Sequence, residues 1–575
     1  MRPSEEFAPV TCATHSRALP LVATFCLLLL SGCALHQARL SGELHGTGGS
    51  ALPHARVLLS KPDGDLSRPL ASAQATPEGR FSLEVPGPGD YRLWLTAPGY
   101  PAQKLLVQMT PENPSVSLQA TLPPYPYRES IEKPAVIGSW NGFAYGKAEP
   151  MQAQPDGTWT FERAVEGDTV SYQLAGITVE ARTVPGTQAE GYDMDPTGDY
   201  QCRVRTRDGQ VRIVFDPRKL PRRTEAQPLV AVFAPPHEYL GRVNALQARA
   251  AEQRKKAFAA FQARGKEAAT VPFNFDYGPL PAELLGHLHD SHLPLLVRQV
   301  AALELLGLPF YDYPKRHPDA EGEALASEIL QLLPVDSSSW TLMPSSVSRL
   351  VMLTNKSSQE QLIQDFLGRN PEESVRAHVL ITRLQMARAA GDTARFTAAY
   401  EQLKPYAQKN WQVRQMLAFL NPDRKVRKGQ PVPAFSTALL DGQGTASRES
   451  LLGRFYLIDF WATWCGPCVE EMPQLHAAWE KFKGRGGFTI LSVSMDGGEE
   501  LVKQFRGEKW KMPWLHALAG HDFEAPLPKA FELHAIPQAI LVDARGNIVA
   551  EDMELRGELL ERTLEVLLPQ ESAKR

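Results

Sequence analysis

The spacing of apolar positions changes twice along the chain. From about residue 40 to 122, and on to about residue 217, apolar and polar residues alternate in short runs that are separated by Gly and Pro. Such alternation with regularly spaced turn residues is typical of β-sandwiches. From residue 235 the apolar positions recur at helical spacing. We therefore expect two N-terminal β-sandwiches, residues 39–122 and 123–220, followed by an α-helical region, residues 235–420.

The last part of the chain, residues 429–570, alternates between strand and helix patterns. Runs rich in Val, Ile, Leu and aromatic residues alternate with amphipathic segments; the expected strands are 455–462, 488–496 and a hairpin within 538–552, and the expected helices are 470–482, 499–508 and 558–568. This order predicts an α/β sheet with a hairpin on one edge. The fold class is therefore multidomain, and the basic stretch Arg424 to Lys428 is interpreted as a linker.

A secretory signal is expected at the N-terminus. A short apolar run from Ala18 to Leu30 follows a basic start, and it is too short for a comfortable membrane span. The next residues, LSGC, resemble the lipobox of bacterial lipoproteins. That resemblance implies that residues 1–32 are a lipoprotein signal peptide and that Cys33 carries the acyl chains. An ordinary cleaved signal and a buried helix are the alternatives. Two acyl chains anchor a protein far better than one.

Composition narrows the possible functions. The 575 residues are 43% hydrophobic and 22% charged, as in folded modules, and the net charge of −4 gives no electrostatic footprint for nucleic acid. Three of the six cysteines lie in or next to the signal sequence. Of the others, Cys202 is isolated and is expected to be a small buried apolar group. Cys465 and Cys468 form the one close pair.

A CxxC pair can be a redox dithiol, half of a zinc site or a haem attachment site. Zinc needs further ligands at structural spacing, and haem attachment needs a His where Val469 stands. A redox pair without metal or cofactor is the remaining prediction. Cys465 falls between a strand and a helix, where free N–H groups stabilise a thiolate. Cys468 lies one turn later, placed to attack a mixed disulfide.

Three segments resemble a known family. DFWATWCGPC (459–468) matches the thioredoxin superfamily, while GQPVPAFSTALLDGQ (429–443) and CVEEMPQL (468–475) resemble its exported TlpA/ResA-like, AhpC/TSA-related branch. The resemblance implies an active site with these roles: Cys465 as nucleophile, Cys468 as resolving thiol, Asp459 as buried proton-relay carboxylate, Trp464 as flat cover beside the sulfur, Pro473 as helix-kinking proline and Pro537 as cis proline opposite the dithiol.

The site departs from the family pattern in two places. Ser492 stands near the position of the lysine that accompanies the buried Asp in cytoplasmic thioredoxins, so Asp459 is expected to lack a cation and to bind its proton more tightly. Gln538 replaces the Thr usual after the cis proline. The dipeptide between the cysteines is that of thioredoxin, which favours a reducing function. Ala462 stands where a peroxidatic site has Thr, which argues against a peroxidase.

Two further resemblances concern the N-terminal half. GRFSLEVPGPGDYRLWLTAPGY (79–100) resembles the carboxypeptidase regulatory-like domain, which implies a spacer or adhesion module. Residues 135–176 resemble the early-set domain that binds glycogen or starch through aromatic platforms. Phe143 stands at the first platform, but no aromatic residue stands at the second, so we expect a structural sandwich with Trp140 and Trp159 in its core.

These observations together predict a thiol-disulfide oxidoreductase of the cell envelope. It is expected to be lipid-anchored, to face the periplasm or the exterior, and to reduce disulfides of client proteins with electrons from a membrane dithiol donor. Ala34 lacks the Asp that retains lipoproteins in the inner membrane, so the choice of membrane stays open. The alternatives are a surface binding or adhesion lipoprotein whose thioredoxin fold only docks, and the same dithiol acting as oxidase or isomerase.

Overall fold

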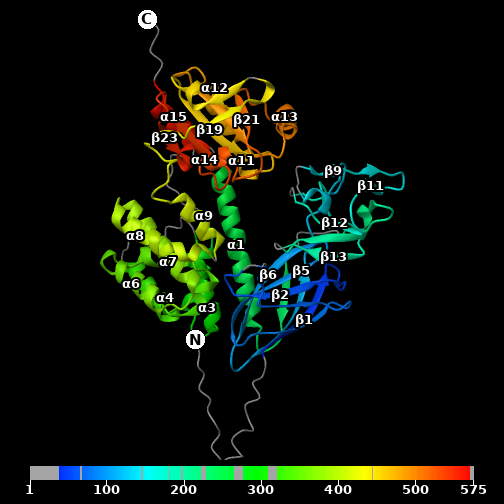
Figure 1. Cartoon of the computed structure of the whole chain (residues 1–575). Helices are drawn as coiled ribbons and strands as arrows, with labels where there is room; N and C mark the ends of the chain where they lie inside the picture. The colour runs from blue at the N-terminus through cyan, green and yellow to red at the C-terminus, as the bar shows by residue number, and fades with distance from the viewer. Residues whose placement is uncertain are drawn as a thin grey trace, which may run out of the picture.

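The computed structural model describes most of the chain (Figure 1). The described residues are 38–64, 66, 68–143, 147–179, 182–195, 198–221, 228–263, 276–308, 320–408, 410–442 and 444–569. The expected signal peptide and Cys33 lie outside them. Within the described residues, no helix combines the length and the apolar character that crossing a membrane requires.

The first β region consists of two four-stranded sheets. One has the order β16-β7-β1-β4 and the other β3-β2-β5-β6. Alternate residues face inward, as in β4, where Phe81 and Leu83 are buried between exposed neighbours. The strands are β1 (Arg39–Gly46), β2 (Arg56–Ser60), β3 (Ala71–Gln74), β4 (Arg80–Glu84), β5 (Gly89–Ala97), β6 (Tyr100–Met109), β7 (Ser115–Leu122) and β16 (Val230–Phe233).

Strand β16 was not expected in this region, because it follows the second β region in the sequence. It pairs antiparallel with β7, with Phe233 opposite Leu118. The chain therefore leaves the first β region after β7, forms the whole second β region, and returns to complete the edge of the first sheet. A four-residue strand has too short a pattern to reveal its partner.

The second β region has a five-stranded sheet of order β13-β14-β12-β8-β9 and a three-stranded sheet of order β10-β11-β15. Trp140 and Trp159, expected in the core, are only half-buried and pack at its margin. Cys202 is fully buried, as expected. The strands are β8 (Ala135–Gly138), β9 (Glu149–Pro150), β10 (Gln152–Ala153), β11 (Trp159–Ala164), β12 (Thr169–Ala175), β13 (Gly191–Met194), β14 (Tyr200–Arg205) and β15 (Gln210–Phe215).

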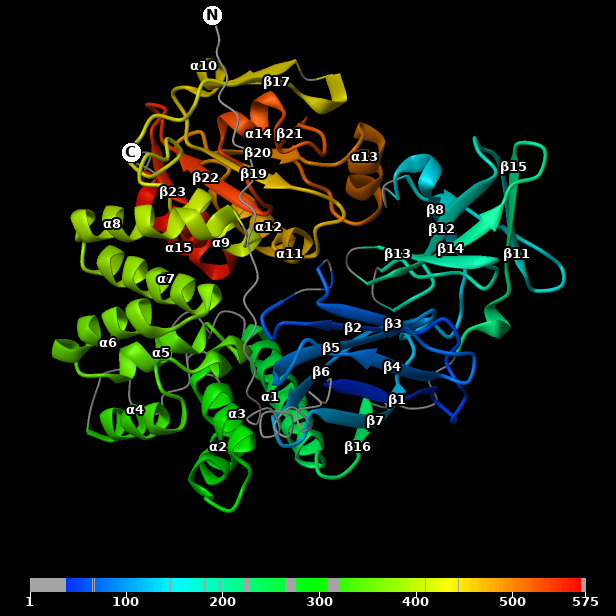
Figure 2. The same cartoon turned by 60° about the horizontal axis from the view of Figure 1, so that its bottom comes forward.

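The two β regions lie side by side (Figure 2). The Tyr200 hydroxyl of β14 donates a hydrogen bond of 2.9 Å to the carbonyl of His54, and the Thr96 hydroxyl of β5 donates to the carbonyl of Gly198 at 3.1 Å. These buried polar contacts cross from one region to the other. They fix the second β region against the first.

The middle of the chain is helical, and its first helix packs against the first β region. In α1, the Asn244 side chain accepts from the Leu106 N–H at 2.7 Å and donates to the Leu106 carbonyl at 2.9 Å. One continuous apolar core extends from the β sheets into these helices. The helices are α1 (Tyr239–Ala263), α2 (Leu280–His289), α3 (Leu295–Leu306), α4 (Ala320–Leu332), α5 (Ser346–Leu353), α6 (Lys356–Arg369), α7 (Glu373–Ala389), α8 (Thr393–Leu403) and α9 (Trp411–Phe419).

The C-terminal domain is the α/β sheet with an edge hairpin that the sequence predicts. Its sheet has the order β21-β20-β19-β22-β23, with β19 parallel to β20 and antiparallel to β22. Its apolar core is separate from the others. The elements are β17 (Ser436–Ala438), β18 (Thr445–Ser447), α10 (Arg448–Leu451), β19 (Tyr456–Trp461), α11 (Gly466–Glu470), α12 (Met472–Phe482), β20 (Thr489–Ser494), α13 (Glu499–Glu508), β21 (Leu515–Leu518), α14 (Pro526–Ala530), β22 (Gln538–Val542), β23 (Ile548–Glu551) and α15 (Gly557–Leu567).

Short 3₁₀ turns connect several of these elements. They are η1 (Ser139–Asn141), η3 (Pro217–Lys219), η5 (Ser338–Leu342), η6 (Lys404–Gln408), η7 (Leu440–Gly442) and η8 (Asp552–Leu555). The last one, η8, joins the edge strand β23 to helix α15. Arg556, the residue that follows η8, lies on the active-site side of the domain.

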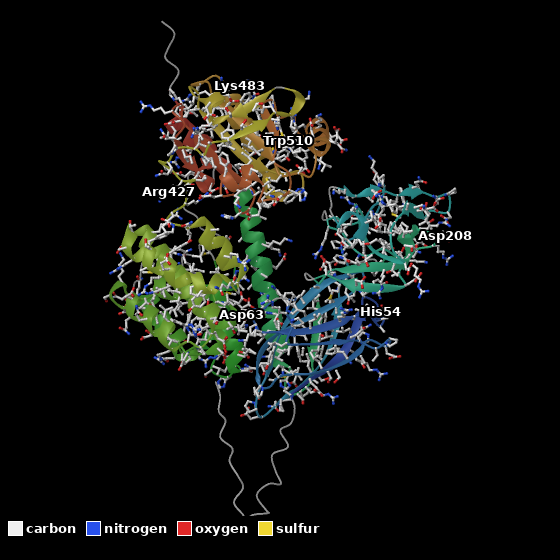
Figure 3. All side chains as sticks on the ribbon, viewed as in Figure 1. His54, Asp63, Asp208, Arg427, Lys483 and Trp510 are labelled. Atoms are coloured by element: carbon white, nitrogen blue, oxygen red, sulfur yellow. A yellow bond between two sulfur atoms is a disulfide. The ribbon has the colours of Figure 1, made fainter. Side chains whose placement is uncertain are left out.

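The basic stretch before this domain is part of it rather than a free linker. Arg424 is only 6% exposed, and its guanidinium lies 3.6 Å from Glu532 and 3.5 Å from Glu551. Burial between carboxylates explains why this basic residue is not in solvent. Arg427, by contrast, is exposed at the junction with the helical region (Figure 3).

Candidate active site

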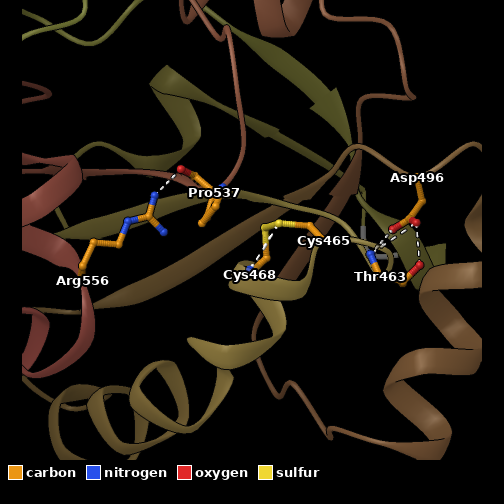
Figure 4. Close-up of a disulfide and its surroundings, with 6 residues drawn as sticks. All are labelled: Thr463, Cys465, Cys468, Asp496, Pro537 and Arg556. Carbon is orange, nitrogen blue, oxygen red and sulfur yellow. Dashed lines mark hydrogen bonds between the residues drawn. A yellow bond between two sulfur atoms is a disulfide. The ribbon is translucent and has the colours of Figure 1, made fainter. Parts of the chain in front are cut away.

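Cys465 and Cys468 form a disulfide at the start of α11 (Figure 4). Cys465 is the N-cap of this helix, and the N–H of Cys468 points at its sulfur at 3.3 Å. Pro467 occupies the first turn, where a residue without an N–H is tolerated. Both sulfur-bearing residues are largely buried, Cys465 being 5% and Cys468 1% exposed. Cys465, the cysteine expected to be the nucleophile, is therefore the more exposed residue of the two.

The loop that carries Cys465 is anchored by Asp496, which was not among the predicted site residues. Asp496 is fully buried just after β20, and its carboxylate accepts hydrogen bonds from the Thr463 N–H at 3.0 Å and from the Thr463 hydroxyl at 2.7 Å (Figure 4). The carboxyl ends of the parallel strands β19 and β20 meet at this edge. An acidic residue at the end of the strand SVSMD was the available signal. Trp464 follows Thr463, and its side chain is half-exposed.

Asp459 lies in the middle of β19 and is 4% exposed. Burial raises the pKa of its carboxyl group from 3.8 to about 6. The charge of Arg556 and the Ser492 hydroxyl, which donates to Asp459 Oδ2 at 3.3 Å, oppose this rise, whereas the negative charge of Glu471 adds to it. Asp459 is thus poised to exchange a proton near neutral pH.

The expectation that Asp459 lacks a cation is wrong. Arg556, in the turn before α15, supplies the nearby positive charge and also donates a hydrogen bond to the carbonyl of Pro537 (Figure 4). The cation was expected on the neighbouring strand, where Ser492 stands. The Trp514 indole N–H donates to the Ser492 hydroxyl oxygen at 2.9 Å. Since an indole N–H can only donate, the hydroxyl hydrogen of Ser492 is left for Asp459.

The peptide bond between Ile536 and Pro537 is cis, which agrees with the conformation that the resemblance implies. Pro537 lies next to the disulfide (Figure 4). Gln538, which follows it, is buried and opens β22 opposite Phe460. Its side-chain amide donates to the carbonyl of Phe531 at 3.4 Å. The amide that replaces the usual Thr is therefore bonded inside the domain.

The helix after the cysteines is interrupted where a kink is expected. Helix α11 ends at Glu470 and α12 begins at Met472, with Pro473 in its first turn. Glu471, between the two helices, accepts a hydrogen bond from the N–H of Gly557 at 2.8 Å. The helix that carries Cys468 is thereby tied to the start of α15.

Other candidate groups lie away from this site. Cys202 is a free thiol in the second β region, and burial raises its pKa to about 12, so it stays protonated. Among the described residues, no group of three or more His, Cys, Asp or Glu side chains could hold a metal ion. Of the predicted site residues, the structure brings Cys465, Cys468 and Pro537 together (Figure 4). It places Asp459 opposite Ala539, two residues after Pro537.

The C-terminal part of the chain is similar to known proteins. The AhpC/TSA family model matches residues 428–551. Thiol-disulfide oxidoreductase ResA of Oceanobacillus iheyensis is 29% identical over 136 residues, which are 22% of this chain and 67% of that protein. ResA of Bacillus cereus is 25% identical over 150 residues, 26% of this chain and 82% of that protein. The thioredoxin domain of a thiol-disulfide oxidoreductase from Bacteroides vulgatus is 34% identical, with 25% of this chain and 99% of that chain covered and a TM-score of 0.23.

The fold and the CxxC site define a thioredoxin-like domain. The family model and the two ResA proteins match this domain, and together they show that the chain is an enzyme of the thioredoxin-like thiol-disulfide oxidoreductase class.

Proposed function

We propose that this protein is a lipid-anchored, extracytoplasmic oxidoreductase that reduces disulfides of client proteins through Cys465 and Cys468. The observation that carries the proposal is the arrangement at one sheet edge. A CxxC pair at a helix start lies beside a cis proline, with a buried aspartate of raised pKa in the central strand. Each step of dithiol exchange has a group suited to it at this edge.

The first half of the reaction uses the reduced pair. The thiolate of Cys465 attacks one sulfur of a client disulfide, forms a mixed disulfide and releases the other client sulfur as a thiolate. Before the attack, the N–H of Cys468 that points at Cys465 Sγ stabilises the negative charge of the Cys465 thiolate. In this proposal the exposed side chain of Trp464 and the cis proline Pro537, which lies next to the disulfide, provide the surface that the client contacts.

The second half resolves the mixed disulfide. The thiol of Cys468 gives its proton to the Asp459 carboxylate, and its sulfur attacks Cys465 Sγ. The bond between Cys465 and the client breaks, and the client leaves as a thiolate that takes a proton from solvent. Two electrons have then passed to the client, and the enzyme holds the disulfide seen in the structure. A dithiol donor in the membrane must reduce it again.

Reduction of insulin by the purified chain in the presence of dithiothreitol tests this activity. Cys465→Ser should abolish it, whereas Cys468→Ser should accumulate a mixed disulfide with insulin that a nonreducing gel reveals. Wild-type turnover in Cys465→Ser would show that the nucleophile is misassigned. A measured reduction potential close to those of strong oxidants such as DsbA, rather than that of thioredoxin, would favour the oxidase or isomerase alternative.

The remainder of the chain is assigned a supporting role in this proposal. Residues 1–32 act as a lipoprotein signal peptide and Cys33 as the acylated anchor. Residues 39–122 form a carboxypeptidase regulatory-like sandwich and residues 123–220 an early-set-like sandwich, which together with the helical region 235–420 hold the thioredoxin-like domain 429–570 away from the membrane. The continuous core between the first β region and the helices supports a rigid spacer.

A further inference from the structure

Two adjacent residues of the C-terminal domain, Arg556 and Gly557, bond to two elements of the active site. Arg556 donates to the carbonyl of Pro537 in the cis-proline loop, and its charge acts on Asp459 in the central strand. The next residue, Gly557, donates its N–H to Glu471, which directly follows the helix that carries Cys468. The turn between η8 and α15 therefore bonds both to the cis-proline loop, as Figure 4 shows for Arg556 and Pro537, and to the residue that follows the cysteine helix. Asp459 lies opposite Ala539, two residues after Pro537, in the strand that pairs with β22.

Arg556 is the group that favours the ionised form of Asp459 by its charge. The groups that act on Asp459 from the elements packed around it are Arg556 from the turn before α15, the Ser492 hydroxyl from β20 and Glu471 from the junction of α11 and α12. Of these three, Arg556 alone carries a positive charge. An opposite charge within a few ångströms favours the ionised carboxylate, and burial disfavours it.

The charge of Arg556 also acts on a second buried carboxyl group. Asp552, in η8, feels the positive charges of both Arg424 and Arg556, while burial raises its pKa. Arg424 lies 3.8 Å from the Asp552 carboxylate. The side chains thus alternate in sign from the start of the domain to the active site: Arg424, Asp552, Arg556, Asp459. The charge of Arg556 thus acts on two carboxyl groups, Asp552 and Asp459.

We propose that Arg556 is a positioning residue of the dithiol reaction: it serves as the cation that keeps Asp459 ready to accept a proton, and it bonds to the cis-proline loop that leads into the strand paired with that aspartate. The inference rests on the proposed function of the dithiol. Arginine stays protonated across the whole range in which Asp459 titrates, so its charge is constant throughout the reaction. The proton that Asp459 receives comes from the Cys468 thiol and is returned to solvent after the client leaves.

The test isolates the step that uses Asp459. The reduced full chain is mixed rapidly with 5,5′-dithiobis(2-nitrobenzoate) between pH 5 and pH 9, and the absorbance of released thionitrobenzoate is followed. Attack by Cys465 releases the first equivalent and forms a mixed disulfide, and attack by Cys468 on Cys465 releases the second. A chain with Cys465→Ser and Cys468→Ser supplies the background from the other cysteines.

Arg556→Gln should leave the first release nearly unchanged and should move the midpoint of the second to higher pH by about 1 unit or more. If the pKa of Asp459 rises by one unit from about 6, the ionised fraction at pH 6 falls from about one half to about one tenth, so the second release should slow about five-fold there. Above pH 8 the two rates should converge. If Arg556 acted only through its hydrogen bond to Pro537, Arg556→Gln would slow the second release by the same factor at every pH.

Two variants complete the test. Arg556→Lys keeps the charge and should restore the midpoint. Arg562→Gln removes an exposed arginine from α15, the helix that follows Arg556, and should behave as wild type. An unchanged midpoint in Arg556→Gln overturns the inference while the proposed function stands. If that variant does not fold, Arg556→Lys decides: a wild-type midpoint supports the inference, and a shift of a full unit overturns it. A wild-type chain that releases no second equivalent contradicts the proposed function itself.

Discussion

The substitution Asp459→Asn should make the oxidised protein more stable at neutral pH. Asp459 is almost fully buried, and burial is the main cause of its raised pKa. Asn has nearly the same size, and its carbonyl oxygen can still accept the hydrogen bond of Ser492, but it cannot ionise. The change therefore removes the buried charge and little else.

The magnitude follows from linkage between protonation and folding. The pKa of Asp459 is about 6 in the folded protein and 3.8 as an ordinary carboxyl group. A difference of about 2 units corresponds to about 3 kcal/mol. Because the folded state binds the proton more tightly, this contribution is fully present below pH 4 and is lost as the pH rises through about 6. Asp459→Asn should thus gain about 3 kcal/mol above pH 7 and nothing below pH 4.

Denaturant unfolding of oxidised protein, followed at several pH values from 3.5 to 8, measures this difference. The disulfide keeps the two cysteines from titrating. A fragment that begins at Asn421 is preferable to the full chain, because several domains do not unfold in one two-state transition. Its core is self-contained, since the buried apolar cluster of this domain runs from Val426 to Leu568.

Asp496→Asn is the matched control, since Asp496 is also buried at the same sheet. Its carboxylate accepts hydrogen bonds from the N–H and the hydroxyl of Thr463, and Asn offers fewer acceptor positions. The control should lower the free energy of unfolding where Asp459→Asn raises it. If the difference between Asp459→Asn and wild type is the same at pH 3.5 and pH 8, the titration assigned to Asp459 is refuted.

Three further predictions concern the rest of the chain. The fragment from Asn421 should fold by itself, and a fragment from Gly429 should be less stable by about 1–3 kcal/mol because it loses Arg424 and leaves its carboxylate partners unpaired; urea unfolding of both compares them. Cys33→Ala should detach the protein from membranes in cell fractionation and shift its active-site pair toward the disulfide in alkylation trapping; an unchanged redox ratio would argue against a membrane donor. The early-set-like region should not co-sediment with glycogen, and retention that Phe143→Ala abolishes would reverse this expectation.

The sequence by itself determined the local features of the molecule. Alternating apolar positions predicted the strands, and the order of strands and helices predicted the α/β sheet with its edge hairpin. Cys465 and Cys468 are one helical turn apart in the chain, so their proximity follows from the helix alone. Between α7 and α8, Gly391 adopts a positive φ of 68° and Asp392 caps the next helix, so this break also depends on adjacent residues. Each of these features depends on neighbours within a few residues.

The tertiary structure decided what depends on residues far apart in the sequence. Asp459 has a cation because the turn before α15 returns to the central strand, and no period or spacing in the sequence relates these two residues. Arg424 is buried because three carboxylates from distant segments surround it, although its own segment looks like an exposed basic linker. Strand β16 pairs with β7 of the first sheet although the whole second β region separates the two strands in the sequence. The spacing of apolar residues in the sequence reveals which face of a helix or strand is buried. Which charged side chains come together in a buried site depends on how the helices and strands pack.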